Sequence, residues 1–249
     1  MGVAALHLHS THSDGRCSVA ETLNLLDAAG GVDVVSFTDH DEIGAWADAL
    51  AWKAEHPESR VTPLWGCEIT IRGGKHLLVY IFRPPYPQQR FPAMRPLRAT
   101  LRQLAEAGGV CIVAHPDHWV VGLGLRRLER ELADVPILGL ESHSPYVRSS
   151  ERLSEFAQLH RLATIGGSDA HFPQHLWKWT TTFPGTTPAD LLRAMEARTT
   201  LPQEGMPAGK VPISEIALQQ VQALLVHPTR KVARLVGKGR LVGKERPAR

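Results

Sequence analysis

The sequence predicts an α/β fold in which parallel strands close into a barrel. Short apolar runs alternate with segments of helical periodicity along most of the 249 residues. Seven or eight such runs favour a closed barrel over an open sheet. The chain is 43% hydrophobic, so it can bury the core of one large domain.

The strands are predicted from runs rich in Val, Ile and Leu, and these runs are 3–8, 32–38, 62–70, 76–82, 109–115, 136–142 and 162–168. The first helix begins with a capping box formed by Ser18 and Glu21, and it ends at Gly30 and Gly31. The later helices are predicted at 43–55, 97–107, 123–133, 149–160 and 188–198. A proline-rich loop, 83–96, interrupts the alternation.

Histidines and carboxylates gather where these strands end. His7 and His9 are two residues apart, hence on one face of the first strand, and Asp14 follows in the next loop. The other members of the set lie at later strand ends, although one of them starts a strand; they are His40, Glu68, His76, His115, Asp169 and His171. A parallel barrel builds its site at the carboxyl ends of its strands. These nine residues therefore predict one shared site.

The residue types of this set indicate a metal centre. Imidazole combined with carboxylate suits Zn²⁺, Mn²⁺ or Fe²⁺, because Ca²⁺ and Mg²⁺ prefer oxygen ligands alone. Nine ligands exceed what one tetrahedral ion takes. The sequence thus predicts two to three divalent metal ions as cofactors.

Six motifs, in this order, carry a resemblance to a known family: "LHLHSTHSDG", "FTDHDE", "GCEIT", "KHLLVY", "VAHP" and "GSDAH". Together they resemble the PHP family of metal-dependent phosphoesterases, named for polymerase and histidinol phosphatase. The resemblance spans about residues 5–185. It implies a distorted (β/α)₇ TIM-like barrel with a trinuclear metal site at its C-terminal mouth, and hydrolysis of phosphoester bonds.

The resemblance also implies how the ligands divide among the ions, with Glu68 bridging the first two. The ligands of the first ion would be His7, His9, Glu68 and Asp169. The second would be held by Glu68, His76 and His115. The third would be held by Asp14, His40 and His171.

Phosphoester hydrolysis suits such a centre. Negative charge develops on both the nucleophile and the leaving group, and neighbouring divalent ions neutralise both. We predict hydrolysis of a phosphomonoester, or of a nucleotide or nucleic-acid end, through a metal-bridging hydroxide. Asp169 and His171 are candidate catalytic residues at the centre. His143 could contact phosphate or protonate the leaving alcohol, and Lys178 could also meet the substrate.

Further polar residues near the motifs are interpreted as supporting or incidental. Asp39 and Asp41 flank His40, and one of them is expected to orient an imidazole. His12 and His118 are interpreted as incidental neighbours. The segment "AHPDHW" lacks the Arg of family members that act on nucleoside bisphosphates or RNA ends, and their long insertion is absent. The site is therefore expected to be open.

Two alternatives stay open. Barrel amidohydrolases also begin with His-x-His, but they cleave C–N bonds and usually close with a lone Asp, whereas "SDAH" supplies both Asp and His. The second alternative is a non-catalytic, metal-stabilised module, against which the complete ligand set argues.

Residues 1–209 are predicted to form the barrel domain, and 210–249 a basic C-terminal helix and tail. From Lys210 onward nine Lys or Arg face two Glu, a net charge of +7, while the rest carries −4. Weak contact with nucleic acid is conceivable, but a solvated terminus explains the tail better. No apolar run is long enough to span a membrane, and the three cysteines form no motif. We expect a cytoplasmic protein without a membrane partner.

Overall fold

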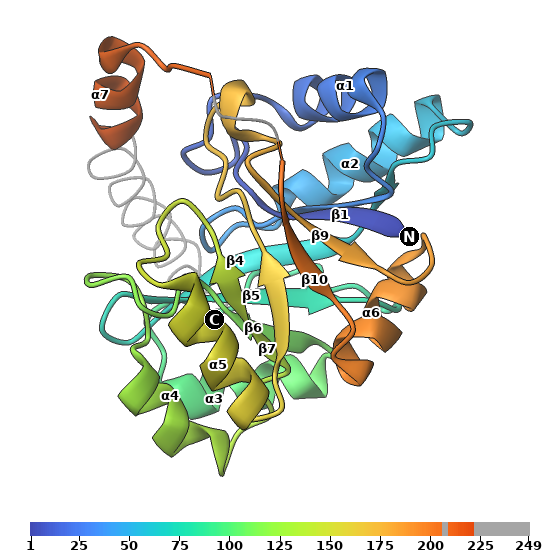
Figure 1. The fold of residues 1–249 in the computed structure, drawn as a ribbon. Helices are drawn as coiled ribbons and strands as arrows, with labels where there is room; N and C mark the ends of the chain where they lie inside the picture. The colour runs from blue at the N-terminus through green and yellow to red at the C-terminus, as the bar shows by residue number, and fades with distance from the viewer. Residues whose placement is uncertain (206–208, 222–249) are drawn as a thin grey trace, which may run out of the picture. The chain divides into compact units, whose positions relative to one another are not determined.

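The computed structural model describes residues 1–205 and 209–221 (Figure 1). The chain forms two compact units, Met1–Lys210 and Val211–Arg249. The described part of the second unit contains one helix, α7 (Ile213–Val221). Most cations of the predicted basic tail, from Arg230 to Arg249, lie outside the described residues. No helix in the described part is long and apolar enough to cross a membrane.

The first unit contains two five-stranded sheets, with the strand orders β10-β9-β1-β2-β3 and β4-β5-β6-β7-β8. The strands of the first sheet are β1 (Gly2–Leu8), β2 (Val34–Phe37), β3 (Thr62–Pro63), β9 (Trp179–Phe183) and β10 (Leu201–Glu204). Those of the second sheet are β4 (Trp65–Ile71), β5 (Lys75–Ile81), β6 (Val110–Val113), β7 (Gly139–His143) and β8 (Ala163–Gly166). The predicted α/β class is confirmed.

Six helices of this unit lie close to their predicted positions. They are α1 (Val19–Ala29), α2 (Gly44–Glu55), α3 (Leu97–Glu106), α4 (Leu125–Leu132), α5 (Ser150–Leu159) and α6 (Pro188–Ala197). The predicted capping box is present at the start of α1, where the Glu21 backbone N–H donates to Ser18 Oγ at 3.2 Å. This hydrogen bond satisfies one of the free donors of the first helical turn.

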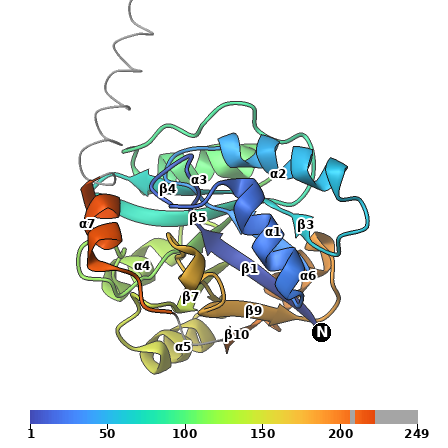
Figure 2. The same ribbon diagram turned by 90° about the horizontal axis from the view of Figure 1, so that it is seen from above.

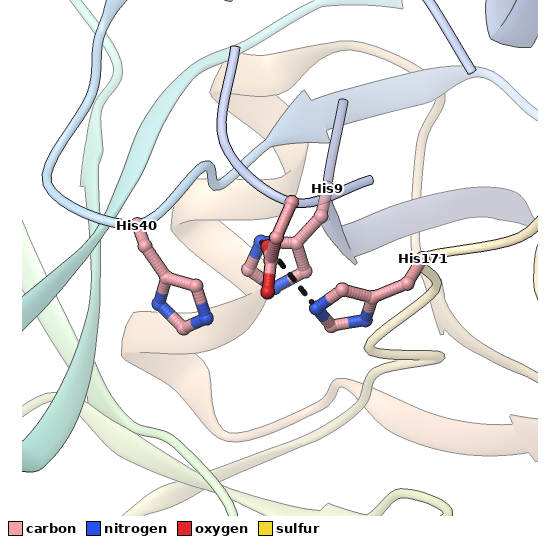
Figure 3. A group of neighbouring side chains, drawn as sticks. His9, His40 and His171 are labelled. Atoms are coloured by element: carbon pink, nitrogen blue, oxygen red, sulfur yellow. Dashed lines mark ion pairs between the residues drawn. The ribbon is translucent and has the colours of Figure 1, made fainter. Parts of the chain in front are cut away.

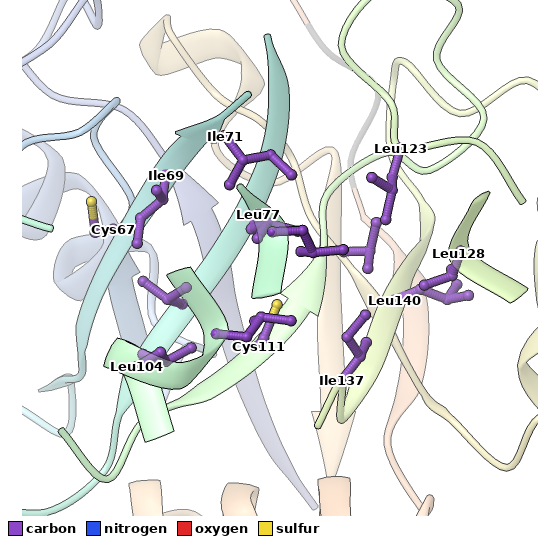
Figure 4. Close-up of a cluster of buried hydrophobic side chains, with 14 of the residues drawn as sticks. Cys67, Ile69, Ile71, Leu77, Leu104, Cys111, Leu123, Leu128, Ile137 and Leu140 are labelled. Atoms are coloured by element: carbon purple, nitrogen blue, oxygen red, sulfur yellow. The ribbon is translucent and has the colours of Figure 1, made fainter. Parts of the chain in front are cut away.

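Three hydrophobic clusters hold the layers together. α1 and α2 pack on the first sheet, where Leu23 and Ala49 meet Val35 of β2, and α1 lies beside β1 (Figure 2). On the second sheet, β4–β7 pack against α3–α5 through the side chains drawn in Figure 4, among them Leu104 and Leu140. The third cluster contains residues from the facing strands of both sheets. The core between the sheets is therefore apolar below the polar strand ends.

The prediction of parallel strands throughout was wrong for β5. This strand runs antiparallel to both β4 and β6. A tight turn joins β4 to β5 in place of a crossover helix, and Gly73 and Gly74 adopt φ angles of 90° and 68° there. Glycine takes such angles without the steric cost that a side chain brings.

Closure into a continuous barrel is also not found among the described residues. The two sheets meet at two seams through isolated parallel bridges, His40 with Glu68 and Leu8 with Ala170. In addition, β9 and β10 extend the first sheet beyond β1 and pair antiparallel there. These two strands were not predicted. The seams nevertheless bring the ends of β1, β2, β4 and the segment after β8 together.

A register irregularity turns the end of β1 toward the second sheet. The pairing with β2 shifts between Ala5 and Leu8. Leu6 packs between the sheets, whereas Leu8 packs in the outer core, although strict alternation would place both on one face. Bulges redirect side chains in this way. As a result, both His7 and His9 face strands of the second sheet.

Tyr80 connects the two sheets beneath this strand end. Its side chain is fully buried, and its hydroxyl donates to the carbonyl oxygen of Leu6 at 2.7 Å. Tyr80→Phe keeps the ring but leaves this carbonyl without the donor, so the free energy of unfolding should fall by about 1–3 kcal/mol. Urea denaturation measures the change. Tyr86→Phe serves as the matched control, because Tyr86 is only partly buried, and an equal loss in both variants would contradict the role of the hydrogen bond.

Candidate metal centre

All nine predicted ligands come together at the seams between the sheets. They form four overlapping groups whose candidate ligand atoms lie within 4.8 Å of one another. The groups are His9, Asp14, His40 and His171; His7, His9 and Asp169; His7, Glu68 and His115; and His40, Glu68 and His76. Their binding of metal stays a prediction, and so does the trinuclear count.

Strand alternation explains why two of these residues point into the site. Cys67 and Ile69 pack in the core beneath the helices, so Glu68 between them faces the other side of β4. In β5, Leu77 packs in that same core and His76 faces the site. Because β5 runs antiparallel to β4, its beginning lies beside the end of β4. This hairpin explains how a histidine at the start of a strand joins ligands at strand ends.

Glu68 lies at the centre of the cluster. Its side chain is 1% exposed. Oε1 lies 3.0 Å from His76 Nδ1 and 3.3 Å from His115 Nε2. Oε2 lies 3.1 Å from His40 Nδ1, and its distances to the two histidines of β1 are 3.4 Å to His7 Nε2 and 3.3 Å to His9 Nε2. One carboxylate thus faces five imidazoles, an arrangement suited to bridging cations.

A second group extends from His9 toward the loop after β8. Asp169 Oδ1 lies 3.0 Å from His9 Nε2, and Asp14 Oδ1 lies 3.3 Å from His171 Nε2. Figure 3 shows the rings of His9, His40 and His171 turned toward one another, with the centroid of His9 4.6 Å from that of His40 and 4.2 Å from that of His171. The side chain of His40 is 23% exposed. The cluster is therefore open to solvent on this side.

The charges in the cluster displace the pKa values of its members. Burial alone would raise the pKa of Glu68, but the imidazoles of His76, His40 and His7 hold it well below its usual range. Burial would lower the pKa of His9, but the nearby carboxylates of Asp169 and Glu68 outweigh it and raise the pKa to about 10. By contrast, burial lowers the pKa of His40 to about 3. Without metal, the carboxylates are ionised and draw protons onto the most enclosed imidazoles.

Several polar atoms of this cluster fit bound divalent ions. Five atoms that face one another in the cluster are buried without a hydrogen-bond partner, namely His7 Nε2, His9 Nε2, Glu68 Oε1 and Oε2, and His76 Nδ1. Buried polar atoms are normally satisfied, and a binding site for an ion is one recognised reason when they have no hydrogen-bond partner. Mixed imidazole and carboxylate donors suit Zn²⁺, Mn²⁺ or Fe²⁺. The residues present therefore fit a centre with more than one cation.

The backbone is strained at two of the ligands. His115 and Asp169 adopt φ angles of 25° and 46°, a region that residues with side chains rarely enter. Such conformations cost about 1–3 kcal/mol each and persist where the surroundings enforce them, often at functional sites. Packing of the loops after β6 and β8 therefore sets the direction of these two side chains.

Two aspartates beside His40 fix loops. Asp39 accepts hydrogen bonds from the backbone N–H groups of Ser10 and Ser13 at 2.8 and 3.1 Å. These bonds order the loop between β1 and α1, which carries the predicted ligand Asp14. Asp41 accepts from the backbone N–H of Thr70 at 2.7 Å. The Asp39 carboxylate thus binds the serine loop, and the orientation of an imidazole by one of the two aspartates stays a prediction.

Glu141 of β7 belongs to the site and was not predicted. It is fully buried. Its Oε1 lies 2.9 Å from His7 Nδ1, and its Oε2 accepts the backbone N–H of His115 at 2.9 Å. Holding His7 through Nδ1 leaves Nε2 directed at the cluster, which is how outer carboxylates orient metal ligands. A side chain at Gly167 would collide with the Glu141 carboxylate, so the glycine permits this contact.

The predicted substrate residues His143 and Lys178 contact residues outside the nine predicted ligands. The ring of His143 packs against Trp179, with centroids 4.8 Å apart, and its Nδ1 lies 2.9 Å from Ser142 Oγ. Burial lowers the pKa of His143. Lys178 lies near His175, where burial and then the lysine charge lower the pKa of the imidazole. Roles of His143 and Lys178 in catalysis or substrate binding stay predictions.

The fold is shared with solved structures that include a PHP-like phosphoesterase and an amidohydrolase. A family model described as PHP-associated matches residues 148–200. A two-domain protein from Bacteroides vulgatus that contains a predicted PHP-like metal-dependent phosphoesterase is similar, with a TM-score of 0.65, 16% identity, and coverage of 82% of this chain and 64% of that chain. The chain thus spans less than two thirds of that relative. The predicted resemblance to the PHP family is confirmed.

Two further structures share the fold. An amidohydrolase from Chromobacterium violaceum, with bound sulfate and no metal, has a TM-score of 0.60 and 20% identity, and the match covers 80% of this chain and 97% of that chain. Endonuclease Q from Pyrococcus furiosus has a TM-score of 0.54 and 16% identity, with coverage of 79% and 56%. Endonuclease Q is also known in complex with a 27-mer duplex that carries an abasic lesion at the active site. Among curated protein sequences, none matches this chain.

Glu141→Gln should weaken metal binding about 10- to 100-fold, because the amide replaces the carboxylate that orients His7 and holds the His115 backbone. Titration with Mn²⁺ followed by calorimetry measures the affinity. Glu129→Gln is the matched control, since the Glu129 side chain is 60% exposed. Gly167→Ala should reproduce the loss by displacing Glu141. Equal affinities in the Glu141 and Glu129 variants would contradict the orienting role.

Metal binding should release protons at pH 7.5. The metal-free site raises the pKa of His7 and His115 as well as that of His9, whose value of about 10 lies far above the ordinary 6.5. A ligand imidazole must be neutral, so apparent metal affinity should rise with pH up to about 10. Calorimetry in buffers of different ionisation enthalpy counts the protons. Binding without net release would show that these imidazoles are already neutral.

Proposed function

We propose that this protein is a metal-dependent phosphoesterase that hydrolyses a phosphomonoester or the end of a nucleotide or nucleic acid. The observation that carries the proposal is the Glu68 carboxylate, buried among five imidazoles with both oxygens lacking hydrogen-bond donors. A buried carboxylate is stable only when positive charge lies close to it. Divalent cations bound beside Glu68 would supply this charge, and they would also neutralise the negative charge that develops when a phosphoester is hydrolysed.

Each residue of the centre would have a distinct role in hydrolysis. Glu68 and Asp169 hold negative charge at the centre, and the histidines around them leave nitrogen atoms directed inward. Glu141 fixes the orientation of His7. Divalent ions bound here would stabilise the phosphoryl oxygens and lower the pKa of the attacking water. His143 at the end of β7 and Lys178 in the segment after η1 (Pro173–His175) are proposed to contact phosphate or the leaving group.

The cluster is open to solvent on one side, which leaves room for a substrate larger than a small phosphomonoester. His40, His76 and His171 keep side-chain exposures of 23%, 14% and 12%. Endonuclease Q, which shares the fold, acts on duplex DNA with an abasic lesion. A nucleic-acid end is therefore included among the proposed substrates. Three ions are proposed for the loaded site, held by the four overlapping ligand groups.

An amidohydrolase activity is the second candidate, favoured by the structural likeness to the Chromobacterium violaceum protein. Phosphoester hydrolysis is preferred because the ligand set here exceeds a binuclear one. His171 and Asp14 lie together at the side of the cluster away from Glu141, 3.3 Å apart, and could hold a further ion together with His40.

The full chain purified without chelators should contain two to three divalent ions, counted by plasma mass spectrometry. With added Mn²⁺ it should release phosphate from an aryl phosphate, and Asp169→Asn or His9→Gln should lower kcat/KM at least about 100-fold. Asp48→Asn is the matched control, because Asp48 pairs with the exposed His12. Turnover of amides or lactams without phosphate release would instead establish the amidohydrolase, and full metal loading without any turnover would establish the structural module.

A further inference from the structure

Residues 115–122 form a rigid loop at the rim of the candidate centre. Within it, the His118 backbone N–H donates to the His115 carbonyl at 2.9 Å, and the Gly122 N–H donates to the His118 carbonyl at 3.0 Å. The loop also reaches β5, where the His76 N–H donates to the Val121 carbonyl at 3.1 Å. His118 thus lies in a loop that begins at the predicted ligand His115 and is hydrogen-bonded to the backbone of another, His76.

The tautomer of His118 follows from its own loop. Its Nδ1 accepts the backbone N–H groups of Val120 and Val121 at 3.3 and 3.2 Å. A nitrogen that accepts hydrogen bonds carries no proton, so the neutral ring carries its proton on Nε2. Among the described residues, Nε2 has no hydrogen-bond partner. The ring packs edge-on against His115, with centroids 5.7 Å apart.

Tyr146 meets His118 from the loop after β7. The two rings pack edge-on with centroids 6.2 Å apart. The Tyr146 side chain is 44% exposed, and its hydroxyl finds no partner in the described part of the chain. Partial burial, together with the carboxylates of Asp169 and Asp14, raises the pKa of Tyr146 to about 12. The phenol therefore keeps its proton at neutral pH and remains a hydrogen-bond donor.

Asp117 locks the two loops together. Its carboxylate accepts the backbone N–H groups of Arg148 and Ser149 at 3.0 and 2.9 Å, directly before α5. The same aspartate precedes His118, so one side chain fixes both the loop of His118 and the loop of Tyr146. Such pre-ordering removes much of the entropic cost of positioning two donors at a binding site.

We propose that His118 and Tyr146 form a substrate-binding pair that donates hydrogen bonds to phosphoryl oxygens at the open side of the centre. The proposal rests on the phosphoesterase function and adds specificity-determining residues to it. Both groups are neutral donors, so they position an anion whose charge the centre compensates. The two donors would contact phosphate in a chain in which no arginine follows the "AHP" motif. His118, interpreted as incidental from the sequence, thereby gains a role.

Inorganic phosphate is the probe, titrated into the Mn²⁺-loaded full chain by calorimetry. Tyr146→Phe removes only the hydroxyl. His118→Asn retains an acceptor near the Nδ1 position for the loop and removes the Nε2–H donor, whereas His118→Gln restores a donor near that position. We expect phosphate Kd to rise about tenfold in Tyr146→Phe and in His118→Asn, and less in His118→Gln. Metal content should not change.

Matched controls and a kinetic measurement distinguish the proposed His118–Tyr146 pair from the proposed phosphoesterase function. Tyr86→Phe and His160→Asn make the same chemical changes away from the centre and should bind phosphate like the unmodified chain. On a phosphoester that is turned over, the Tyr146 and His118 variants should raise KM more than they lower kcat. Unchanged phosphate affinity in both variants, with a wild-type chain that binds phosphate, overturns the pair alone. A metal-loaded wild-type chain that neither binds phosphate nor hydrolyses phosphoesters overturns the pair together with the phosphoesterase function.

Discussion

The burial of Glu68 is the constraint on which the site depends. An ionised carboxylate removed from water loses several kcal/mol of solvation unless charge and hydrogen bonds replace it. Here the replacement comes from five imidazoles on both sheets, which place positive charge around it only when protonated or when cations stand between them. Protons and metal ions therefore compete for the same nitrogens, and without metal the most enclosed imidazoles hold the protons.

The predicted ligands lie where the two sheets meet. Single bridges join the sheets at His40 with Glu68 and at Leu8 with Ala170, so each seam contains or adjoins predicted ligands. Below the seams, the apolar core and the Tyr80 hydrogen bond keep the sheets in register. The polar site lies on a packed base and opens only toward the loops.

Periodicity and polarity predicted much of this from the sequence, and the misses have physical reasons. Glu68 and His76 were found because polar side chains stand out in apolar strands. The β4–β5 hairpin was missed because an apolar run does not state its direction, although Gly73 and Gly74 mark the turn. Glu141 carries the same signal as Glu68, an acid in a buried strand, and could have been found. The His118 contact with Tyr146 could not, since only tertiary packing joins those loops.

The molecule separates metal binding from substrate contact by the kind of element that carries each. Most ligands lie on strands or directly at their ends, where the sheets restrict them, and Glu141 reinforces this from inside β7. The candidate substrate donors lie on loops after β6 and β7, which Asp117 ties to the start of α5. Loops change with little effect on a packed core. Substrate preference can therefore shift through residues such as His118 and Tyr146 while the buried charges that require cations stay where the strands hold them.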